Sequence, residues 1–368
     1  MAAPDVLIVG GGIFGLSVAW SCRHAGMSVR VLETHLPGAG ASGGVVGALT
    51  PHAPSGWRPM MAFQFHALLA LETRIAEIEA ATGLHCGYAR TGRLTPLATA
   101  KMREAAERDV AAAPQTWGQA ARYEVLETVP QELASWIRPE AALHGLVHDT
   151  ISARVDPRAY VAALASALAD CISPGTEVTG IDPASARAFT ADGPVTGGHL
   201  VIASGWQAWD LVHPHMEGLQ GAAVKGQAAV LGVQADGLPV VYQDGLYIIP
   251  HGAGRVAVGS TSEKRFETSD QTDALLDSLL EKARTVCPAL TGAEVLERWA
   301  GLRPKPPGRE PVIGPLAEYP RTWVAGGGYK ISFGIAHAVG DGVAAGIAGG
   351  VPAITLPTSF GPRAHLSD

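Results

Sequence analysis

The sequence of 368 residues has few features of metal-dependent, disulfide-bonded or membrane proteins. Its four cysteines and 13 histidines form no CxxC, HxxH or HExxH pattern, so no metal site is expected. The cysteines are expected to be reduced, partly buried thiols. No apolar run reaches the roughly 18 residues that a membrane-spanning helix needs, so no membrane span is expected.

The sequence also has no long block of charges of one sign. The net charge is -7 and no long run of Lys or Arg occurs, which argues against a nucleic-acid partner. The first residues, MAAPDVLIVGGG, lack a basic segment and a small-residue cleavage site, so we expect a cytoplasmic protein. The length and an apolar content of 47% predict two intimately connected domains.

The N-terminal region has the pattern of a β-α-β unit. An apolar run at Val6–Val9 predicts a strand, Ile13–His24 a helix and Ser28–Leu32 a second strand. Further helices are expected at Pro59–Thr82, Ala98–Ala121, Asp156–Ala169 and Gly334–Ala348, and strands at Thr91–Leu97, His199–Ala203, Val240–Pro250, Arg255–Gly259 and Thr322–Gly326.

A dinucleotide fingerprint follows the first strand. Gly10, Gly12 and Gly15 form GxGxxG, whose glycines permit a tight turn, a close approach to pyrophosphate and close packing of helix on strand. The N-terminus of the helix then faces the phosphates. Glu33 ends the second strand, where its carboxylate can accept hydrogen bonds from ribose hydroxyls and would repel a 2′-phosphate. The unit therefore predicts a dinucleotide other than NADP.

A second Gly-rich segment distinguishes FAD from NAD. Residues Gly38–Leu49 read GAGASGGVVGAL and follow the second strand at once. NAD-binding proteins have no need of such a segment, whereas the longer FAD must be threaded past further small residues. The segment resembles the second FAD-contacting loop of the D-amino-acid oxidase and glycine oxidase family of flavoproteins.

Other motifs in the same order extend this resemblance over nearly the whole chain. They are VDPRAY (155–160), VIASGWQAW (201–209), VKGQ (224–227), DGLYIIP (244–250), GRVAVGST (254–261), WAGLRPKPPGREPVIGP (299–315) and GGGYKISFGIAHAVGDGVA (326–344). The sequence is most similar to glycine oxidases and to the related oxidases of sarcosine and iminodiacetate. It differs at Lys330, where the glycine oxidase pattern usually has Arg.

The resemblance implies an α/β fold, α+β overall. We expect a Rossmann-like FAD-binding domain at 1–85, 150–220 and 321–368, and a discontinuous antiparallel-sheet substrate domain at 86–149 and 221–320. It also implies the FAD contacts, namely Gly10, Gly12, Ile13, Phe14, Gly15, Glu33, Thr34, Ala41, Ser42, Gly47, Leu49, Val178, Ser204, Gly205, Trp206, Gly301, Arg303, Gly328, Tyr329, Lys330, Ile331 and Ser332. No Cys occurs at 302–314, where monomeric sarcosine oxidases attach their flavin, so FAD is expected to be bound non-covalently.

Three residues are expected to contact the substrate. The resemblance assigns Arg303 as the carboxylate anchor, for which its planar fork is well suited, and Tyr247 as a hydroxyl facing the substrate. Lys330 is expected to add charge near the substrate or flavin, and His52 is a weaker candidate for the flavin edge. We thus expect an oxidase of glycine, sarcosine or iminodiacetate that transfers hydride from Cα to flavin N5, giving an imine that hydrolyses to an oxo acid, with O2 reduced to H2O2.

Several alternatives stay open from the sequence. One is a D-amino-acid or 2-hydroxy-acid dehydrogenase that passes electrons to a quinone or carrier. Another is a tRNA-modifying flavoprotein, which the acidic charge balance disfavours. A third is a flavin-binding protein without turnover. The partners expected are a small-molecule substrate, O2 or an electron carrier, and possible further copies of the same chain.

Overall fold

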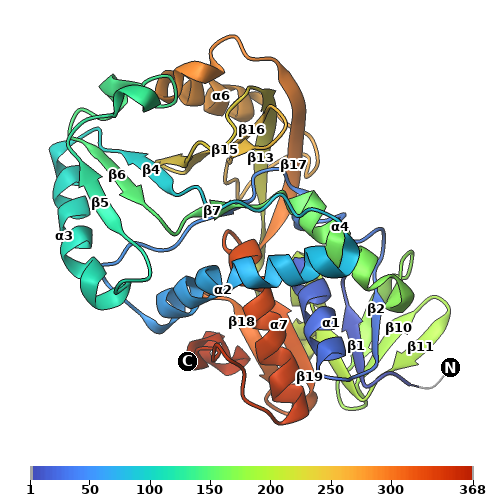
Figure 1. The fold of residues 1–368 in the computed structure, drawn as a ribbon. Coiled ribbons are helices and arrows are strands. Elements are labelled where there is room, and N and C mark those ends of the chain that lie inside the picture. Colours follow the sequence, from blue (N-terminus) through green and yellow to red (C-terminus); the bar gives the residue numbers. More distant parts are fainter. Residues whose placement is uncertain (1–2, 367–368) are drawn as a thin grey trace.

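The computed structural model describes residues 3–366, so residues 1–2 and 367–368, which the expected domain ranges include, lie outside the described residues. Within this part the chain forms the α-helices α1 (Ile13–His24), α2 (Pro59–Thr82), α3 (Ala100–Thr116), α4 (Pro157–Ala167), α5 (Ala208–Val212), α6 (Ala274–Val286) and α7 (Ser332–Ala348). The α-helices and two larger sheets form a mixed α/β fold, as predicted (Figure 1).

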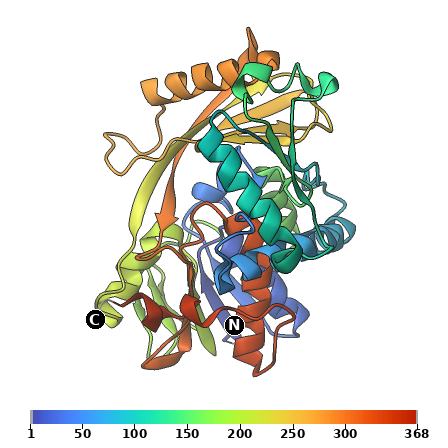
Figure 2. The ribbon, with the colours of Figure 1, turned by 90° about the vertical axis from the view of Figure 1, so that its left-hand side faces the viewer.

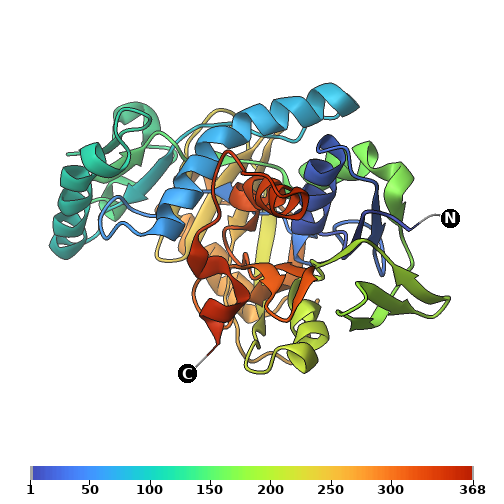
Figure 3. The same cartoon turned by 90° about the horizontal axis from the view of Figure 1, so that it is seen from below.

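A six-stranded sheet contains the N-terminal β-α-β unit. Its order is β18 (Val312–Leu316), β19 (Tyr319–Gly326), β12 (His199–Ile202), β1 (Val6–Val9), β2 (Val29–Leu32) and β8 (Ile172–Ser173). All neighbours are parallel except β18 and β19. Val6 and Ile8 pack under α1, α2, α4 and α7, whereas Leu7 and Val9 pack on α5 and its surroundings. Figure 3 shows α1, α2 and α7 on one side of this sheet, and the short helix α5 with the small antiparallel sheet of residues 178–196 on the other.

An eight-stranded sheet forms the other half of the molecule. Its order is β17 (Val295–Lys305), β13 (Ala222–Gly232), β16 (Arg255–Gly259), β15 (Leu246–His251), β14 (Val240–Gln243), β4 (Arg93–Pro96), β6 (Leu146–Asp149) and β5 (Tyr123–Leu126). Helix α6 lies across this sheet at the end of the molecule away from α7, and the long strand β17 runs back towards the six-stranded sheet (Figure 2). Smaller sheets join β9 (Val178–Asp182), β10 (Arg187–Thr190) and β11 (Gly193–Thr196), and β3 (Ala48–Leu49) with β7 (Ala153–Arg154).

Local sequence signals explain most element ends. Helix α2 begins at Pro59 and ends before Gly83, which has a φ of 69°. The helix expected at Ala98–Ala121 is shorter than predicted, because the Thr99 hydroxyl caps the amide of Met102 and the chain turns at Gly118 with a φ of 58°. Helix α7 begins two residues before the predicted Gly334.

The pairing of strand β18 conflicts with one of the expected domain boundaries. It pairs with β19 in the six-stranded sheet, with Gly314 opposite Val324. A boundary between residues 320 and 321 would fall inside β19 and separate most of it from β18, to which it is joined by a tight turn. The two-domain division stays a proposal, and its last boundary is better placed before Val312.

Candidate active site

A cavity of about 970 Å³ lies where the two larger sheets meet. The six-stranded sheet contributes the β1–α1 turn, the end of β2, and residues 325–330 at and after the end of β19. The eight-stranded sheet contributes Tyr247 of β15 and residues 299–304 of β17 to the wall of the cavity. Other parts of the wall come from residues 38–42, 44–48, 176–179 and 203–207. The cavity is of the size expected for a cofactor and a small substrate together.

The β1–α1 turn leaves no room for side chains. Gly10 has a φ of 105°, and a Cβ atom there would lie 2.6 Å from the carbonyl oxygen of Ala203. A Cβ at Gly15 would lie 1.9 Å from the carbonyl oxygen of Gly10. Gly12 caps α1, and the amide of Ile13 donates to Ser42 Oγ at 3.0 Å. The turn therefore exposes backbone and the helix N-terminus to the cavity, which suits a pyrophosphate.

The carboxylate of Glu33 is fixed by backbone amides. Its Oε2 accepts from the amide of Gly11 at 2.7 Å, and its Oε1 accepts from that of His35 at 2.8 Å. Each carboxylate oxygen has a further lone pair, and Glu33 lines the cavity. A hydroxyl of a bound ribose can therefore still donate to it.

The second Gly-rich segment is tied to both halves of the molecule. A Cβ atom at Gly47 would lie 1.9 Å from the carbonyl oxygen of Val155, so this part of the segment lies directly against the chain before α4. Arg158 of α4 donates to the carbonyl oxygen of Gly43 at 2.7 Å and pairs with Glu297 of β17 at 2.6 Å. These contacts fit a loop that holds an extended cofactor in place.

Arg303 occupies a space left by a glycine. Its guanidinium lies over Gly226 of β13, where a Cβ atom would come within 1.9 Å of the terminal nitrogens. Nη1 donates to the carbonyl oxygen of Thr261 at 3.1 Å. Among residues 3–366 no carboxylate lies within ion-pair distance of Arg303. Burial lowers the pKa of Arg303, and Tyr329 and Glu263 act in the opposite direction. The group is thus a cation available to an anionic ligand.

Tyr247 and Lys330 line the same cavity. The hydroxyl of Tyr247 lies 3.2 Å from Thr50 Oγ1, and burial raises its pKa. Lys330 is exposed at the cavity wall, with its Nζ 5.6 Å from the ring centre of Tyr329. Partial desolvation lowers the pKa of Lys330, Tyr329 opposes the shift and the charge of Arg303 adds to it. Within the described chain Lys330 has no acidic partner.

Most of the residues expected at the site line this one cavity. They are Gly10, Gly12, Ile13, Phe14, Glu33, Thr34, Ala41, Ser42, Gly47, Val178, Ser204, Gly205, Trp206, Tyr247, Gly301, Arg303, Gly328, Tyr329, Lys330 and Ser332. Gly15, Leu49 and Ile331 do not line it, since Gly15 packs on Gly10, Leu49 is buried in the core and Ile331 packs against that core. His52 also lies off the cavity, with its amide and Nδ1 bound by Gln64 Oε1.

Three residues of the site were not anticipated. Gly226 provides the space for Arg303, Thr50 binds the hydroxyl of Tyr247, and Trp299 packs near Gly44 on the face of β17 that also carries Arg303. A glycine inside a strand is a signal of close approach by another group, and VKGQ contains one. Thr50 and Trp299 have no comparable signal.

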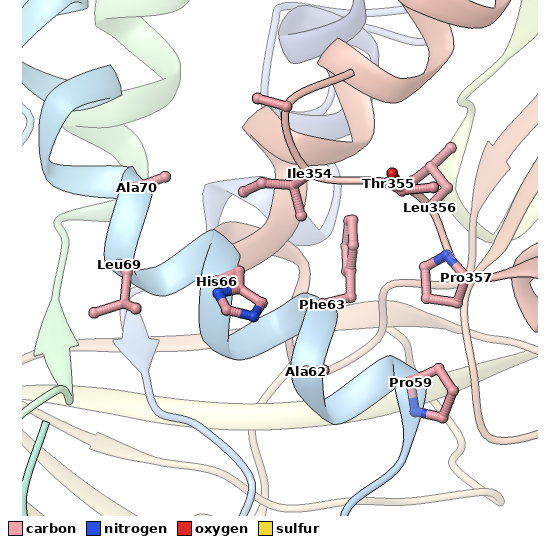
Figure 4. Close-up of a pocket in the computed structure, with 11 residues that line it drawn as sticks. Pro59, Ala62, Phe63, His66, Leu69, Ala70, Ile354, Thr355, Leu356 and Pro357 are labelled. Atoms are coloured by element: carbon pink, nitrogen blue, oxygen red, sulfur yellow. The ribbon is translucent and has the colours of Figure 1, made fainter. Parts of the chain in front are cut away.

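A second depression of about 740 Å³ lies between α2 and residues 353–357 (Figure 4). Its wall is apolar apart from His66 and Thr355, both labelled in the figure. It has no Arg, Lys, Asp or Glu, so it lacks a charged group for a carboxylate or an amine.

Other classes of site find no support in the described part of the chain. Residues 3–366 contain no group of three metal-ligating side chains. No helix there is both long and apolar enough to cross a membrane. Cys22, Cys86, Cys171 and Cys287 are unpaired thiols, and none of them lines the cavity.

Comparisons with known proteins identify the family of the chain. Glycine oxidase of Bacillus licheniformis is 27% identical over 92% of this chain and 91% of its own, and that of Pseudomonas putida is 33% identical over only 48% of each. The crystal structure of glycine oxidase from Geobacillus kaustophilus has a TM-score of 0.88 at 24% identity over 99% of both chains. The crystal structure of an iminodiacetate oxidase from Chelativorans has a TM-score of 0.81 at 23% identity and covers 97% of this chain and 98% of the other. The FAD dependent oxidoreductase (DAO) family matches residues 5–345; the chain belongs to this family, and its cofactor is FAD.

Proposed function

We propose that this enzyme oxidises the C–N bond of a small amino acid or an N-substituted glycine. The observation that carries the proposal is the guanidinium of Arg303, which lines the cavity over Gly226 without an acidic partner. A carboxylate is the anion that its planar fork binds best. The names of the glycine oxidases and the iminodiacetate oxidase similar to this chain support the same class of substrate.

In this proposal the protein positions the substrate. When bound, FAD would supply the acceptor for the hydride from Cα and would transfer the electrons to O2, giving H2O2, or to another carrier. Arg303 holds the α-carboxylate, and Tyr247 contacts the substrate with its hydroxyl. The amine must be neutral, because its nitrogen lone pair forms the C=N double bond as the hydride leaves Cα. The imine hydrolyses to an oxo acid, such as glyoxylate, and an amine or ammonia.

We also propose which residues contact each part of FAD. We assign the pyrophosphate to the β1–α1 turn, the adenosine ribose to Glu33, and the flavin to the region between Gly47 and Arg303. Residues 328–330 and Ser332 line the same cavity, where Gly328 packs against Phe14 and the turn at Tyr329 has a φ of 47°. A cytoplasmic location stays part of the proposal.

Lys330 suggests a preference within this class. Arg303 and Lys330 are two cations on one cavity, and a glycine carboxylate neutralises only one of them. A dicarboxylate such as iminodiacetate places its first carboxylate on Arg303 and its second towards Lys330. The compact charge and flexible stem of a lysine suit this longer reach. We therefore favour an N-substituted glycine with extra negative charge over free glycine.

An anaerobic screen tests the proposed function. Glycine, sarcosine, iminodiacetate, D-alanine and D-proline are mixed separately with the enzyme, and the visible absorbance of the flavin is followed. At least one of the first three should bleach the flavin, and admission of air should restore the colour with release of H2O2. Bleaching by none of the amines would contradict the proposal. Recolouring only with a quinone would identify a dehydrogenase.

A further inference from the structure

Two opposed glycines form a bare patch on the cavity face of strands β13 and β17. Gly226 and Gly301 pair directly across the two strands. The guanidinium of Arg303 lies over Gly226, within 1.9 Å of the position of a Cβ atom there, and the indole of Trp299 lies over Gly301, within 2.5 Å of the corresponding position. Alternate residues of a strand share one face, so these two side chains lean towards each other from either side of Gly301.

The same edge of the indole contacts the second Gly-rich segment. Cη2 and Cζ2 of Trp299 lie 3.4 and 3.5 Å from the position of a Cβ atom at Gly44, and they are also the atoms nearest to that position at Gly301. The indole packs in addition against the apolar cluster that contains Val45, and both residues line the cavity. Trp299 therefore lies between the Gly-rich segment and the part of β17 that carries Arg303.

A salt bridge holds this segment against β17. Glu297, two residues before Trp299, accepts from Nη1 and Nη2 of Arg158 at 3.0 and 2.6 Å. Nε of Arg158 also donates to the carbonyl oxygen of Gly43 at 2.7 Å. Because the segment is fastened to β17 through this contact, the size of the side chain at position 299 determines how closely the segment can approach Arg303.

We propose that Trp299 is a positioning residue that sets the spacing between the second Gly-rich segment and the guanidinium of Arg303. The inference rests on the proposed function, because it takes Arg303 to be the carboxylate anchor and the segment to contact the flavin. A substrate held by its carboxylate then presents Cα to the flavin at a distance that the indole fixes. Hydride transfer needs the reacting atoms about 3–3.5 Å apart, so a shift of about 1 Å can lower the rate about 100-fold while the carboxylate contact persists.

Trp299→Phe tests this inference, because it removes the indole edge and keeps an aromatic ring. Three quantities are measured. They are the FAD Kd of the apoprotein, the acetate Kd of the FAD-loaded enzyme from the shift of its visible absorbance, and the rate of anaerobic flavin reduction by the amine that reduces wild type fastest. The reduction rate at saturating substrate should fall about tenfold or more, whereas both Kd values should stay within about threefold of wild type. A purely structural role of Trp299 would weaken FAD binding, acetate binding and reduction together.

A compensating variant and a control complete the test. Trp299→Phe/Gly44→Ala adds a methyl group on the side that the indole edge vacates, and Gly44 has a φ of -64°, which alanine also adopts. The double variant should regain at least about threefold in reduction rate over Trp299→Phe, whereas Gly44→Ala alone should bring no gain, because the indole still fills that space. Trp57→Phe is the control. Trp57 is also half-buried, but it packs on Phe65 outside the cavity, so all three quantities should equal those of wild type.

The outcomes separate the inference from the proposed function. If no amine reduces the wild-type flavin, the proposed function is wrong and the inference is wrong with it. If an amine does so but Arg303→Ala binds acetate as tightly as wild type, the proposed anchor and the inference are both wrong. If Trp299→Phe is reduced as fast as wild type, or if its three quantities worsen together, the positioning role alone is wrong. The same holds if the double variant shows no gain over Trp299→Phe.

Discussion

The guanidinium of Arg303 lies so close to the backbone of Gly226 that a Cβ atom at position 226 would come within 1.9 Å of both terminal nitrogens. The two residues belong to neighbouring antiparallel strands, β17 and β13, which pair along almost their whole length. The direction of the guanidinium is therefore set by a missing side chain on the adjacent strand and by the carbonyl of Thr261.

The first prediction follows from this contact. Gly226→Ala should displace Arg303 and lower kcat/KM by an amount that corresponds to about 2–4 kcal/mol of lost transition-state stabilisation. Arg303→Ala should have a similar effect, because both variants remove a charge-assisted pair with the substrate carboxylate. Arg303→Lys should recover only part of the loss. Steady-state kinetics of the FAD-loaded variants measure this. Gly232→Ala on the same strand, where the nearest contact would be 3.6 Å, is the control and should keep wild-type kinetics.

Lys330 gives a prediction about substrate preference. Lys330→Met should penalise kcat/KM for iminodiacetate more than for sarcosine, by on the order of 1 kcal/mol or more, because only the dicarboxylate reaches the ammonium with a second carboxylate. Kinetics of both substrates with wild type and variant measure the difference. Equal losses for the two substrates would show that Lys330 does not bind a second carboxylate.

Glu33 gives a prediction about cofactor affinity. Glu33→Ala should weaken FAD binding and yield apoprotein that refills at high FAD, because the acceptor for the ribose hydroxyls and the clamp on the Gly11 amide are both lost. Glu33→Gln keeps one acceptor oxygen and should lie between Glu33→Ala and wild type. Fluorescence titration of apoprotein with FAD gives the Kd values. An unchanged Kd in Glu33→Ala would place the ribose elsewhere.

The form of FAD attachment is tested by acid precipitation. No cysteine lines the cavity, so the yellow colour should pass completely into the supernatant when the protein is precipitated. Absorbance spectra of pellet and supernatant measure this. Colour that stays with the washed pellet would mean that another side chain attaches the flavin.

His337 predicts a loss of stability in acid. It is buried in α7, and desolvation lowers its pKa to about 4, with Arg74 adding to the shift and Asp341 opposing it. The unfolded chain binds the proton more readily than the folded protein does. The free energy of unfolding is therefore not reduced by this group above pH 6.5, and it falls by about 3 kcal/mol as the pH drops towards 4. Urea unfolding between pH 7 and 4 should show this slope in wild type and a flatter one in His337→Leu. His85→Leu, at an exposed site, should keep the wild-type slope.

Much of the fold follows from local sequence signals. The β-α-β unit, the limits of α2 and the β15–β16 pair were predictable because each depends on residues close together in the chain, such as Gly83 at the end of α2. The helix expected up to Ala121 was too long, since alanine-rich composition extends beyond the point at which Gly118 turns the chain. The pairing of β18 with β19 was not predicted, because the sequence indicated no strand at residues 312–316 and placed them in the substrate domain.

The sequence by itself determined that the chain binds a dinucleotide, because the glycines of the β1–α1 turn and Glu33 must be near neighbours in any β-α-β unit. The resemblance of its motifs then pointed to FAD and to Arg303. Only the tertiary structure decided how Arg303 is held, because Gly226 and Thr261 reach it through the strand pairing of segments far apart in the chain. The same long-range pairing buries Lys225 between two carboxylates, a charge arrangement that no local spacing specifies.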